Sequence, residues 1–449
     1  MTEKKKNQEI MHSPHEIPSR SRRRFMHGLL GTAAAASFSR FDKIAWAYPD
    51  DIETIRKTSA GMDAAAESEP FWMMVKNQFS LRKGLIMLNA ANLCPSPFPV
   101  QRAVFNLTRS IDRDPSSHNR SQFQERLETS RESLARYLGA EPDEIAIIRN
   151  TSEGNNMVIN GLTFQQGDEV VIWDENHPTA NIAWDIRAER YGFVVKRVRV
   201  PEKITSPDDL VQPFLKAVTS KTRLLSFSHL SNISGIALPA SEICSQAAVR
   251  GVLTHIDGAQ TFGSQKVNLH ELGCDFYTGS SHKWFLGPKE VGVLYVKKNR
   301  IPELWPTIVG VGYPQARRQG ARKFETLGQR DDARIAAMAT AAAFHQAVGG
   351  ERIESRIKRL ADVLRKKLQS RISSIQFRTP LDPSCSGGVI VFNIPGLDLP
   401  KALDILYKRR GIGCAVFGGD LAGIRMCPHI YNTLEEMELA AEAVASLGG

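Results

Sequence analysis

The sequence predicts an α/β protein: a large domain with a mostly parallel sheet flanked by helices, followed by a smaller C-terminal α+β domain. Between residues 145 and 296, short apolar segments of strand length alternate with longer segments of helical periodicity, a pattern typical of parallel sheets. After residue 330 this alternation stops, and an Ala-rich helix, an amphipathic basic helix and an isolated apolar strand follow. Ligands of parallel sheets bind beyond the carboxyl ends of the strands. Polar residues that directly follow strands are therefore candidates for a site.

The segments before the sheet predict a short lead into the large domain. Residues 48–85 have the pattern of a helical arm, and residues 85–88 that of a strand ending at Asn89. Prolines at 95, 97 and 99 predict a loop. Residues 123–138 have helical spacing, closed by Gly139.

The alternating region then supplies the sheet. Strands are expected at 145–148, 169–173, 194–200, 224–229, 252–256 and 291–296, and helices at 154–161, 179–191 and 240–250. In the C-terminal part, helices are expected at 334–348, 352–368 and 435–447, and a strand at 389–394. The predicted organisation is a signal peptide (1–47), a helical arm (48–85), a large domain (86–330) and a small domain (331–449).

Two segments near the middle of the chain point to a cofactor. Asp257 directly follows the apolar run that ends at Ile256, and Lys283 lies 26 positions later among small and hydroxyl residues. This pair suits pyridoxal 5′-phosphate (PLP): the lysine can form a Schiff base with the cofactor aldehyde, and the acid can pair with the ring nitrogen and keep it protonated. A lone Lys or a lone Asp in such a position is more often structural, so it is the ordered pair that carries the prediction.

The two motifs, Asp-Gly-Ala-Gln from Asp257 and Ser-Ser-His-Lys-Trp-x-x-Gly-Pro-Lys from Ser280, resemble the core of the class V aminotransferases of PLP fold type I. The similarity runs from about Leu88 to the C-terminus. It implies a seven-stranded-type sheet in the large domain and a homodimer. The family includes cysteine desulfurases, isopenicillin N epimerase, kynureninase-like lyases and transaminases.

The resemblance also implies roles for the residues around the cofactor. Thr151 and Ser152, between a predicted strand and helix, would bind its phosphate, since hydroxyls and free N–H groups at a helix start bind anions; without the family, one of them is simply a helix N-cap. The other roles implied are phosphate contacts from Ser280 and His282, a hydrogen bond to the ring hydroxyl from Gln260, and ring stacking from His177. The alternative for His177 is a turn histidine before proline.

For the substrate, the resemblance implies that Arg425 binds a carboxylate through paired hydrogen bonds. Asn232 matches an asparagine near the substrate, and Asn89 is assigned to the same group. Gln329 stands where relatives usually have a threonine that reaches the phosphate of the neighbouring subunit, so this contact is in doubt. An arginine between apolar residues could instead be an ordinary strand residue.

Within the family, the sequence disfavours a cysteine desulfurase, because Cys414 comes too early before Arg425 and lies in an apolar run. Epimerisation, transamination and side-chain cleavage by a lyase remain open. The chain is isopenicillin N epimerase-like, and also resembles the periplasmic PLP enzymes that tailor the peptide siderophore pyoverdine, which act on a residue of an assembled peptide. A non-catalytic binding protein of this fold is the opposing class; the presence of Lys283 and Asp257 argues against it.

The N-terminus predicts export by the twin-arginine translocase to the periplasm. Ser21 to Met26 fits the twin-arginine pattern, and a short apolar stretch and an Ala-x-Ala site ending at Ala47 follow. The alternative is a basic disordered tail. The chain carries a net charge of +10, of which nine Lys/Arg against four Asp/Glu in residues 1–47 supply +5. No basic run interleaved with aromatics points to nucleic acid, no later segment is long and apolar enough for a membrane, and the six cysteines have no zinc-ligand spacing.

Overall fold

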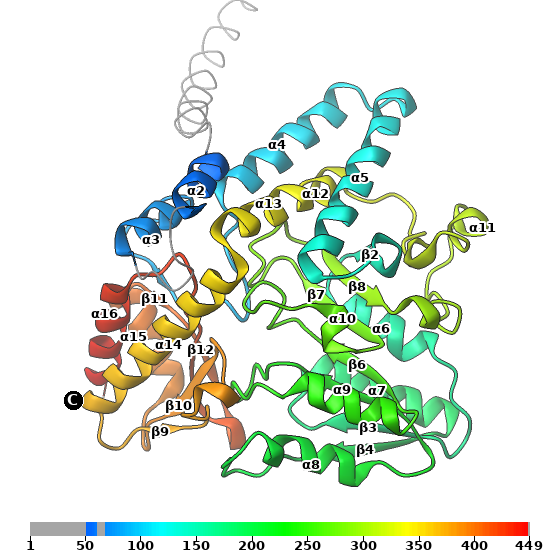
Figure 1. Ribbon diagram of the computed structural model, residues 1–449. Coiled ribbons are helices and arrows are strands. Elements are labelled where there is room, and N and C mark those ends of the chain that lie inside the picture. The colour runs from blue at the N-terminus through cyan, green and yellow to red at the C-terminus, as the bar shows by residue number, and fades with distance from the viewer. Residues whose placement is uncertain (1–50, 61–67, 448–449) are drawn as a thin grey trace, which may run out of the picture. The chain divides into compact units, whose positions relative to one another are not determined.

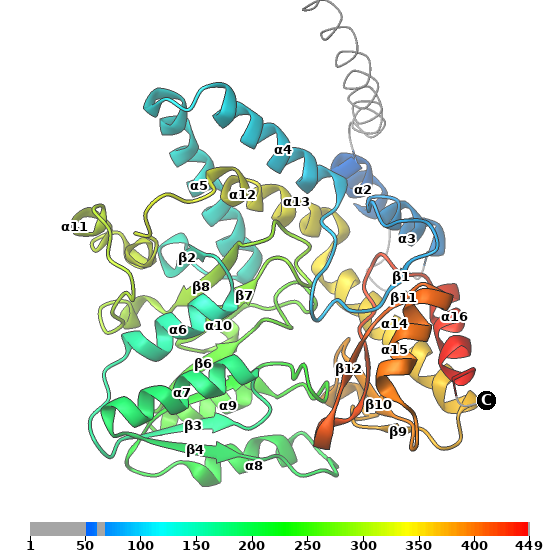
Figure 2. The ribbon, with the colours of Figure 1, turned by 180° about the vertical axis from the view of Figure 1, so that it is seen from behind.

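A seven-stranded sheet forms the centre of the computed structural model, which describes residues 51–60 and 68–447 (Figures 1 and 2). In order across the sheet, the strands are β2 (Ile145–Ile148), β8 (Gly292–Val296), β7 (Phe276–Ser280), β6 (Leu253–Asp257), β5 (Thr222–Ser228), β3 (Glu169–Trp173) and β4 (Val194–Val198). The neighbours from β7 to β4 are parallel, whereas β8 is antiparallel to both β2 and β7. The predicted mostly parallel, seven-stranded sheet is confirmed.

Alternate residues of a strand point to opposite faces of the sheet, and in β2 both sets are buried. Ile145 and Ile147 of β2 pack in one cluster with residues of α5 (Ser117–Leu138), α8 (Asp208–Ala217) and α9 (Ala240–Val249). Ala146 and Ile148 pack in another with residues of α6 (Thr151–Gly161) and α7 (Pro178–Tyr191). Helices therefore cover both faces and leave the strand ends for a site.

The segment before the sheet differs from the prediction at the prolines. It contains α2 (Asp51–Ala60), α3 (Glu69–Lys76), β1 (Ile86–Met87) and α4 (Phe98–Arg113). The predicted loop at residues 95–99 runs straight into α4, with Pro97 at the N-cap and Pro99 in the first turn. Proline is tolerated there because the first N–H groups of a helix have no acceptor within it. α4 lies beside α12 (Asp332–Ala336) and α13 (Met338–Val348).

The C-terminal part is built on an antiparallel sheet of four strands. In order they are β12 (Ala415–Phe417), β13 (Gly423–Met426), β10 (Ile390–Asn393) and β9 (Gln376–Phe377), with α14 (Gly350–Arg371), α15 (Leu399–Arg410) and α16 (Leu434–Ala445) around them. β1 pairs in parallel with β11 (Ile412–Gly413), so the segment after α3 joins this part (Figure 2). The boundaries at 85 and 330 stay a prediction.

Further elements also differ from the prediction. Strand β7, which leads to Lys283, was not predicted, and α5 begins at Ser117, before the predicted start at 123. Short helices α10 (Leu269–Leu272) and α11 (Tyr313–Ala316) join the larger elements. The predicted signal peptide lies outside the described residues. Among the residues that the structure does describe, no helix is both long enough and apolar enough to span a bilayer.

Candidate active site

A cavity of about 230 Å³ lies where β3, β5, β6 and β7 end and α6 and α7 begin. This is the edge of the sheet at which a ligand was expected. Nine of the predicted site residues line it: Thr151, Ser152, His177, Asn232, Asp257, Gln260, Ser280, His282 and Lys283. The fold therefore brings together side chains separated by up to 132 positions, as counted from Thr151 to Lys283.

Lys283 follows β7 and reaches the cavity with a half-buried side chain. Burial lowers the pKa of its amine; Asp257 opposes this shift and the positive charge of Arg425 adds to it. The uncharged amine is therefore more available near neutral pH than that of an exposed lysine. An uncharged amine is the form that attacks an aldehyde or takes a proton.

The carboxylate of Asp257, the last residue of β6, is fixed by two hydrogen bonds. Its Oδ2 accepts from Nδ2 of Asn155 at 2.8 Å, and its Oδ1 accepts from the backbone N–H of Ala259 at 2.9 Å. Thr278 in turn donates to Oδ1 of Asn155 at 2.6 Å. Both Asp257 and Asn155 are buried, so the carboxyl group that lines the cavity is held in one orientation.

Asn155 was missed in the sequence. It lies one helical turn after Thr151, and residues four apart share a helix face, which is the signal that could have identified it. The helix approaches β7 very closely: a Cβ on Gly154 would lie 2.8 Å from Cγ2 of Thr278. Glycine at 154 therefore allows α6 to bring Asn155 against Asp257.

The start of α6 presents hydroxyl and N–H donors to the cavity. Asn150, and not Thr151 or Ser152, is the N-cap of this helix, since its Oδ1 accepts from the N–H of Glu153 at 3.0 Å. The alternative role of Thr151 or Ser152 as the cap is therefore wrong. The N–H and the hydroxyl of Thr151 each lie 2.8 Å from Oγ of Ser280. A helix start of this kind suits a phosphate.

Two histidines and a glutamine border the same space. His177 lies exposed at the cavity and is also the N-cap of α7, accepting from the N–H of Thr179 at 3.3 Å, so both interpretations of it are compatible with its position. Burial, with Lys283 and Lys289, lowers the pKa of His282 to about 4, so its ring is neutral at physiological pH. Gln260 accepts from the indole N–H of Trp284 at 2.8 Å and donates to the backbone carbonyl of Ala91 at 3.2 Å.

Arg425, on β13, is joined to both predicted substrate-binding asparagines. It donates to the backbone carbonyl of Asn232 at 3.1 Å and to Oδ1 of Asn89 at 3.0 Å. The guanidinium is buried and lies 5.2 Å from the ring centroid of Phe417. Within residues 51–60 and 68–447, its Nε has no hydrogen-bond partner. A buried guanidinium whose Nε–H has no acceptor among the described residues is a suitable partner for a substrate carboxylate.

Gln329 and the cysteines lie apart from this arrangement. Gln329 is exposed and donates to the backbone carbonyl of Arg330 at 2.9 Å. All six cysteines are unpaired thiols, and the five other than Cys414 are buried. Cys414 lies between β11 and β12 and not within a strand as expected; burial raises the pKa of its thiol to about 12. A thiol of this kind is a poor nucleophile at neutral pH.

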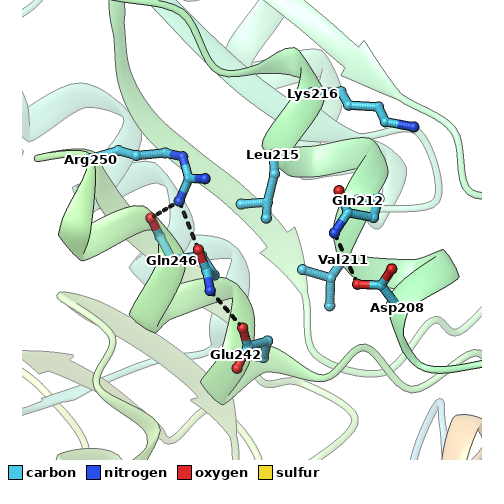
Figure 3. A pocket seen from close by; sticks show the side chains of 8 residues that line it. All are labelled: Asp208, Val211, Gln212, Leu215, Lys216, Glu242, Gln246 and Arg250. Carbon is cyan, nitrogen blue, oxygen red and sulfur yellow. Dashed lines mark hydrogen bonds between the residues drawn. The ribbon is translucent and has the colours of Figure 1, made fainter.

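A second hollow lies between α8 and α9, where its polar side chains bind one another along each helix (Figure 3). Gln246 donates to Glu242 at 2.9 Å and Arg250 donates to the Gln246 side chain at 2.9 Å, while Gln212 donates to Asp208. None of the predicted site residues lines this hollow.

Comparisons with known proteins identify the family of the chain. Residues 106–439 match the family model described as aminotransferase class-V. The chain belongs to this family. It is 33% identical over 393 residues to isopenicillin N epimerase of Amycolatopsis lactamdurans and 30% identical to that of Streptomyces clavuligerus, each match covering 84% of this chain and 98% of the relative. A probable cysteine desulfurase of Methanothermobacter thermautotrophicus is 28% identical, over 84% of this chain and 98% of the relative.

Solved structures support the fold. A C-DES mutant with glycine covalently linked to its PLP cofactor has a TM-score of 0.76 at 24% identity, over 83% of this chain and 99% of that one. Apo cysteine desulfurase from Thermococcus onnurineus NA1 has a TM-score of 0.75 at 24% identity, over 83% and 97%. The predicted PLP fold type I is confirmed.

This class V aminotransferase is a PLP-dependent enzyme, and its residues suit the cofactor. The cavity supplies an amine with a lowered pKa at Lys283, a fixed carboxylate at Asp257 and a helix start for a phosphate at Thr151. These three groups match the aldehyde, the ring nitrogen and the phosphate of PLP in chemical kind.

Proposed function

We propose that the protein is an exported PLP-dependent enzyme that acts at the α-carbon of an amino acid or of a peptide-borne amino group, in an epimerase-like or transaminase-like reaction. The observation that carries this proposal is the buried cation Arg425, whose charge acts on the amine of Lys283 and whose guanidinium is held by Asn232, a residue that lines the cavity. The two most similar relatives given above are named as epimerases.

In this mechanism, PLP, when bound, withdraws electrons from the substrate's α-carbon. Arg425 binds the substrate carboxylate through its guanidinium, which Asn89 and Asn232 orient. Lys283 takes the α-proton and can return it. Asp257 would hold the ring nitrogen of the cofactor through a carboxylate that Asn155 and Ala259 keep in place.

The choice between epimerase and transaminase depends on where the proton returns. Return to the opposite face of the α-carbon gives epimerisation, and return to a different carbon gives transfer of the amino group. The same residues would serve a lyase if the bond broken in the substrate were one that joins its side chain, and not only Cα–H.

A cysteine desulfurase is the second candidate, because several relatives carry that name. Such a reaction needs a nucleophilic thiol. Burial raises the pKa of Cys414 to about 12, and raises that of Cys94 to about 12 as well. No cysteine is among the residues that line the cavity. These observations favour chemistry at the α-carbon without a thiol, and the presence of Lys283 and Asp257 favours an enzyme over a non-catalytic binding protein.

Two further parts of the proposal concern location and assembly. Arg22 and Arg23, followed by an apolar stretch and a small-residue site, support twin-arginine export to the periplasm. A homodimer is supported by the apolar segment 305–311, in which Trp305 is 63%, Val309 62% and Val311 100% exposed. Apolar side chains gathered in one exposed segment are typical of an interface. A periplasmic location also agrees with a peptide-borne substrate.

Hydrogen exchange at the α-carbon tests the function. The PLP-loaded protein is incubated in D₂O with a panel of L- and D-amino acids and small peptides, and the α-hydrogen signal is followed by NMR. We expect loss of this signal with the wild type, accompanied by the opposite enantiomer or by a keto acid, and no loss with Lys283→Ala. Release of sulfide from cysteine, with no α-hydrogen exchange in any amino acid other than cysteine and its product alanine, would establish the desulfurase alternative instead.

A further inference from the structure

We infer that Glu175 is a positioning residue that fixes the Asn232 loop and through it the carboxylate-binding Arg425. The inference rests on the proposed role of Arg425 and adds a residue that the motifs did not single out for the site. Glu175 follows β3 and precedes His177 by two positions. Neither of its carboxylate oxygens is within the cavity lining, so it acts through other residues.

The carboxylate of Glu175 binds two serines of one tight turn. Its Oε2 accepts from the hydroxyl of Ser231 at 2.7 Å and also from the hydroxyl of Ser234. Ser231 accepts through the same hydroxyl from the N–H groups of Ile233 and Ser234, each at 3.0 Å. The turn around Asn232 is therefore closed on itself and joined to the loop after β3.

This turn supplies one of the two oxygens that orient the arginine. Asn232 lies between the two serines that Glu175 binds, and its backbone carbonyl accepts from Nη1 of Arg425 at 3.1 Å. A backbone carbonyl can be displaced only by moving the backbone. Releasing the turn from Glu175 therefore shifts an acceptor of the guanidinium, while Asn89 still accepts from Nη2.

A carboxylate at this place is costly, which argues for a purpose beyond folding. Burial is the largest influence on Glu175 and raises its pKa, whereas the two serine hydroxyls lower it. Thr379, from the C-terminal part, also donates to the backbone carbonyl of Ser234 at 2.6 Å. The turn around Asn232 is therefore hydrogen-bonded from two sides, by Glu175 in the loop after β3 and by Thr379 in the segment before β10.

Two amines that differ only in a carboxylate provide the test. Glycine carries the group that Arg425 binds, and methylamine does not. Binding of each to the PLP-loaded protein is followed by the change in cofactor absorbance. We expect Glu175→Ala to weaken glycine about tenfold, in keeping with one lost hydrogen bond to a charged group, and to leave methylamine within about twofold. Glu175→Gln keeps an acceptor oxygen and should restore most of the glycine affinity.

Glu169→Ala is the matched control. Glu169 begins β3, at the opposite end of the strand from Glu175, and its Oε2 accepts from the hydroxyls of Thr219 and Thr222 at 2.6 and 3.1 Å. It should leave both amines unchanged. Equal weakening of glycine and methylamine by Glu175→Ala, or no weakening, would overturn the inference. Arg425→Ala tests the proposed carboxylate site separately from the role of Glu175. If this variant too affects the binding of glycine and methylamine equally, the proposed carboxylate site itself is wrong.

Discussion

Asn155 donates a hydrogen bond of 2.8 Å to the carboxylate of Asp257, from the second turn of α6 to the end of β6. Because Thr278 donates to the oxygen of the same amide, the amide cannot rotate without losing one of the two bonds. The nitrogen of Asn155 is therefore always directed at Asp257. The position of this carboxylate is set by a helix and by two neighbouring strands.

Asn155→Ala should accordingly slow α-hydrogen exchange about tenfold or more, because Asp257 loses a buried donor that costs roughly 1–3 kcal/mol to remove. The cofactor should stay attached to Lys283. Exchange rates and cofactor absorbance measured on the same sample check both parts. The neighbouring Asn156→Ala removes an exposed amide that bonds within its own helix, donating to the backbone carbonyl of Ser152 and accepting from the side chain of Asn160, and should change neither. Equal effects of the two variants would contradict this role of Asn155.

Lys283 should be the only lysine that carries the cofactor. Reduction with borohydride followed by peptide mass mapping should place the pyridoxyl group on the peptide that contains it. Lys289 is a demanding control, because burial lowers the pKa of its amine too. Lys289→Arg should keep the label and Lys283→Arg should lose it. A label found on any other lysine would refute the assignment.

Stability should fall with acid because buried histidines stay neutral in the folded protein. Burial lowers the pKa of His345 from 6.5 to about 3. Below pH 6.5 the unfolded chain binds a proton that the folded chain does not, so the free energy of unfolding decreases as the pH falls from about 6.5 towards 3. At pH 5 this one residue lowers the free energy of unfolding by about 2 kcal/mol.

The check is urea unfolding of wild type and His345→Gln at pH 7 and pH 5. The variant loses the bonds of the ring with Tyr137 and Phe285, and so should be less stable at pH 7. Its loss of stability between pH 7 and pH 5 should nevertheless be smaller than that of the wild type by about 2 kcal/mol. An unchanged difference between the two pH values would argue against a neutral, buried His345.

Cys414→Ala should keep α-hydrogen exchange within about twofold of the wild type, since a thiol whose pKa is raised to about 12 takes no part in it. Sulfide release from cysteine is measured alongside. Sulfide produced by the wild type and abolished in this variant would reverse the assignment and favour the desulfurase.

Replacing Arg22 and Arg23 by lysine should leave the precursor in the cytoplasm, as expected of a twin-arginine address. Fractionation of cells expressing the two forms checks this. Normal arrival of the double variant in the periplasm would mean that another signal directs export.

The sequence predicted most strands of the sheet and several of its flanking helices, in two cases to the residue, because their apolar runs are continuous. β2 and β3 have the bounds expected. It missed β7, whose residues Phe276–Ser280 are mostly small or hydroxyl-bearing, so that no apolar run marks a strand that is nevertheless wholly buried. It also missed α4, because prolines at 97 and 99 indicate a break when the local pattern is considered alone.

For the site, the motifs located nine residues around one cavity: Asp257 and Lys283 from their own chemistry and order, and the roles of the other seven through resemblance to a family. The partners of those residues follow from packing that no local pattern contains. Asn155 contacts Asp257 across 102 positions, and Glu175 contacts Ser231 across 56. Which asparagine or glutamate reaches such a partner depends on how closely α6 approaches β7 and on the turn after β5.

The guanidinium of Arg425 bonds to Asn89, which is 336 positions earlier, and lies on a strand close to the last helix of the chain. A ribosome that has made the chain as far as Lys283 has delivered this lysine and Asp257, yet not β13, the strand that we propose to recognise a carboxylate. A nascent chain can therefore acquire the reactive lysine before it acquires selectivity for its substrate. On this proposal, discrimination between amines first becomes possible once β13 has been synthesised.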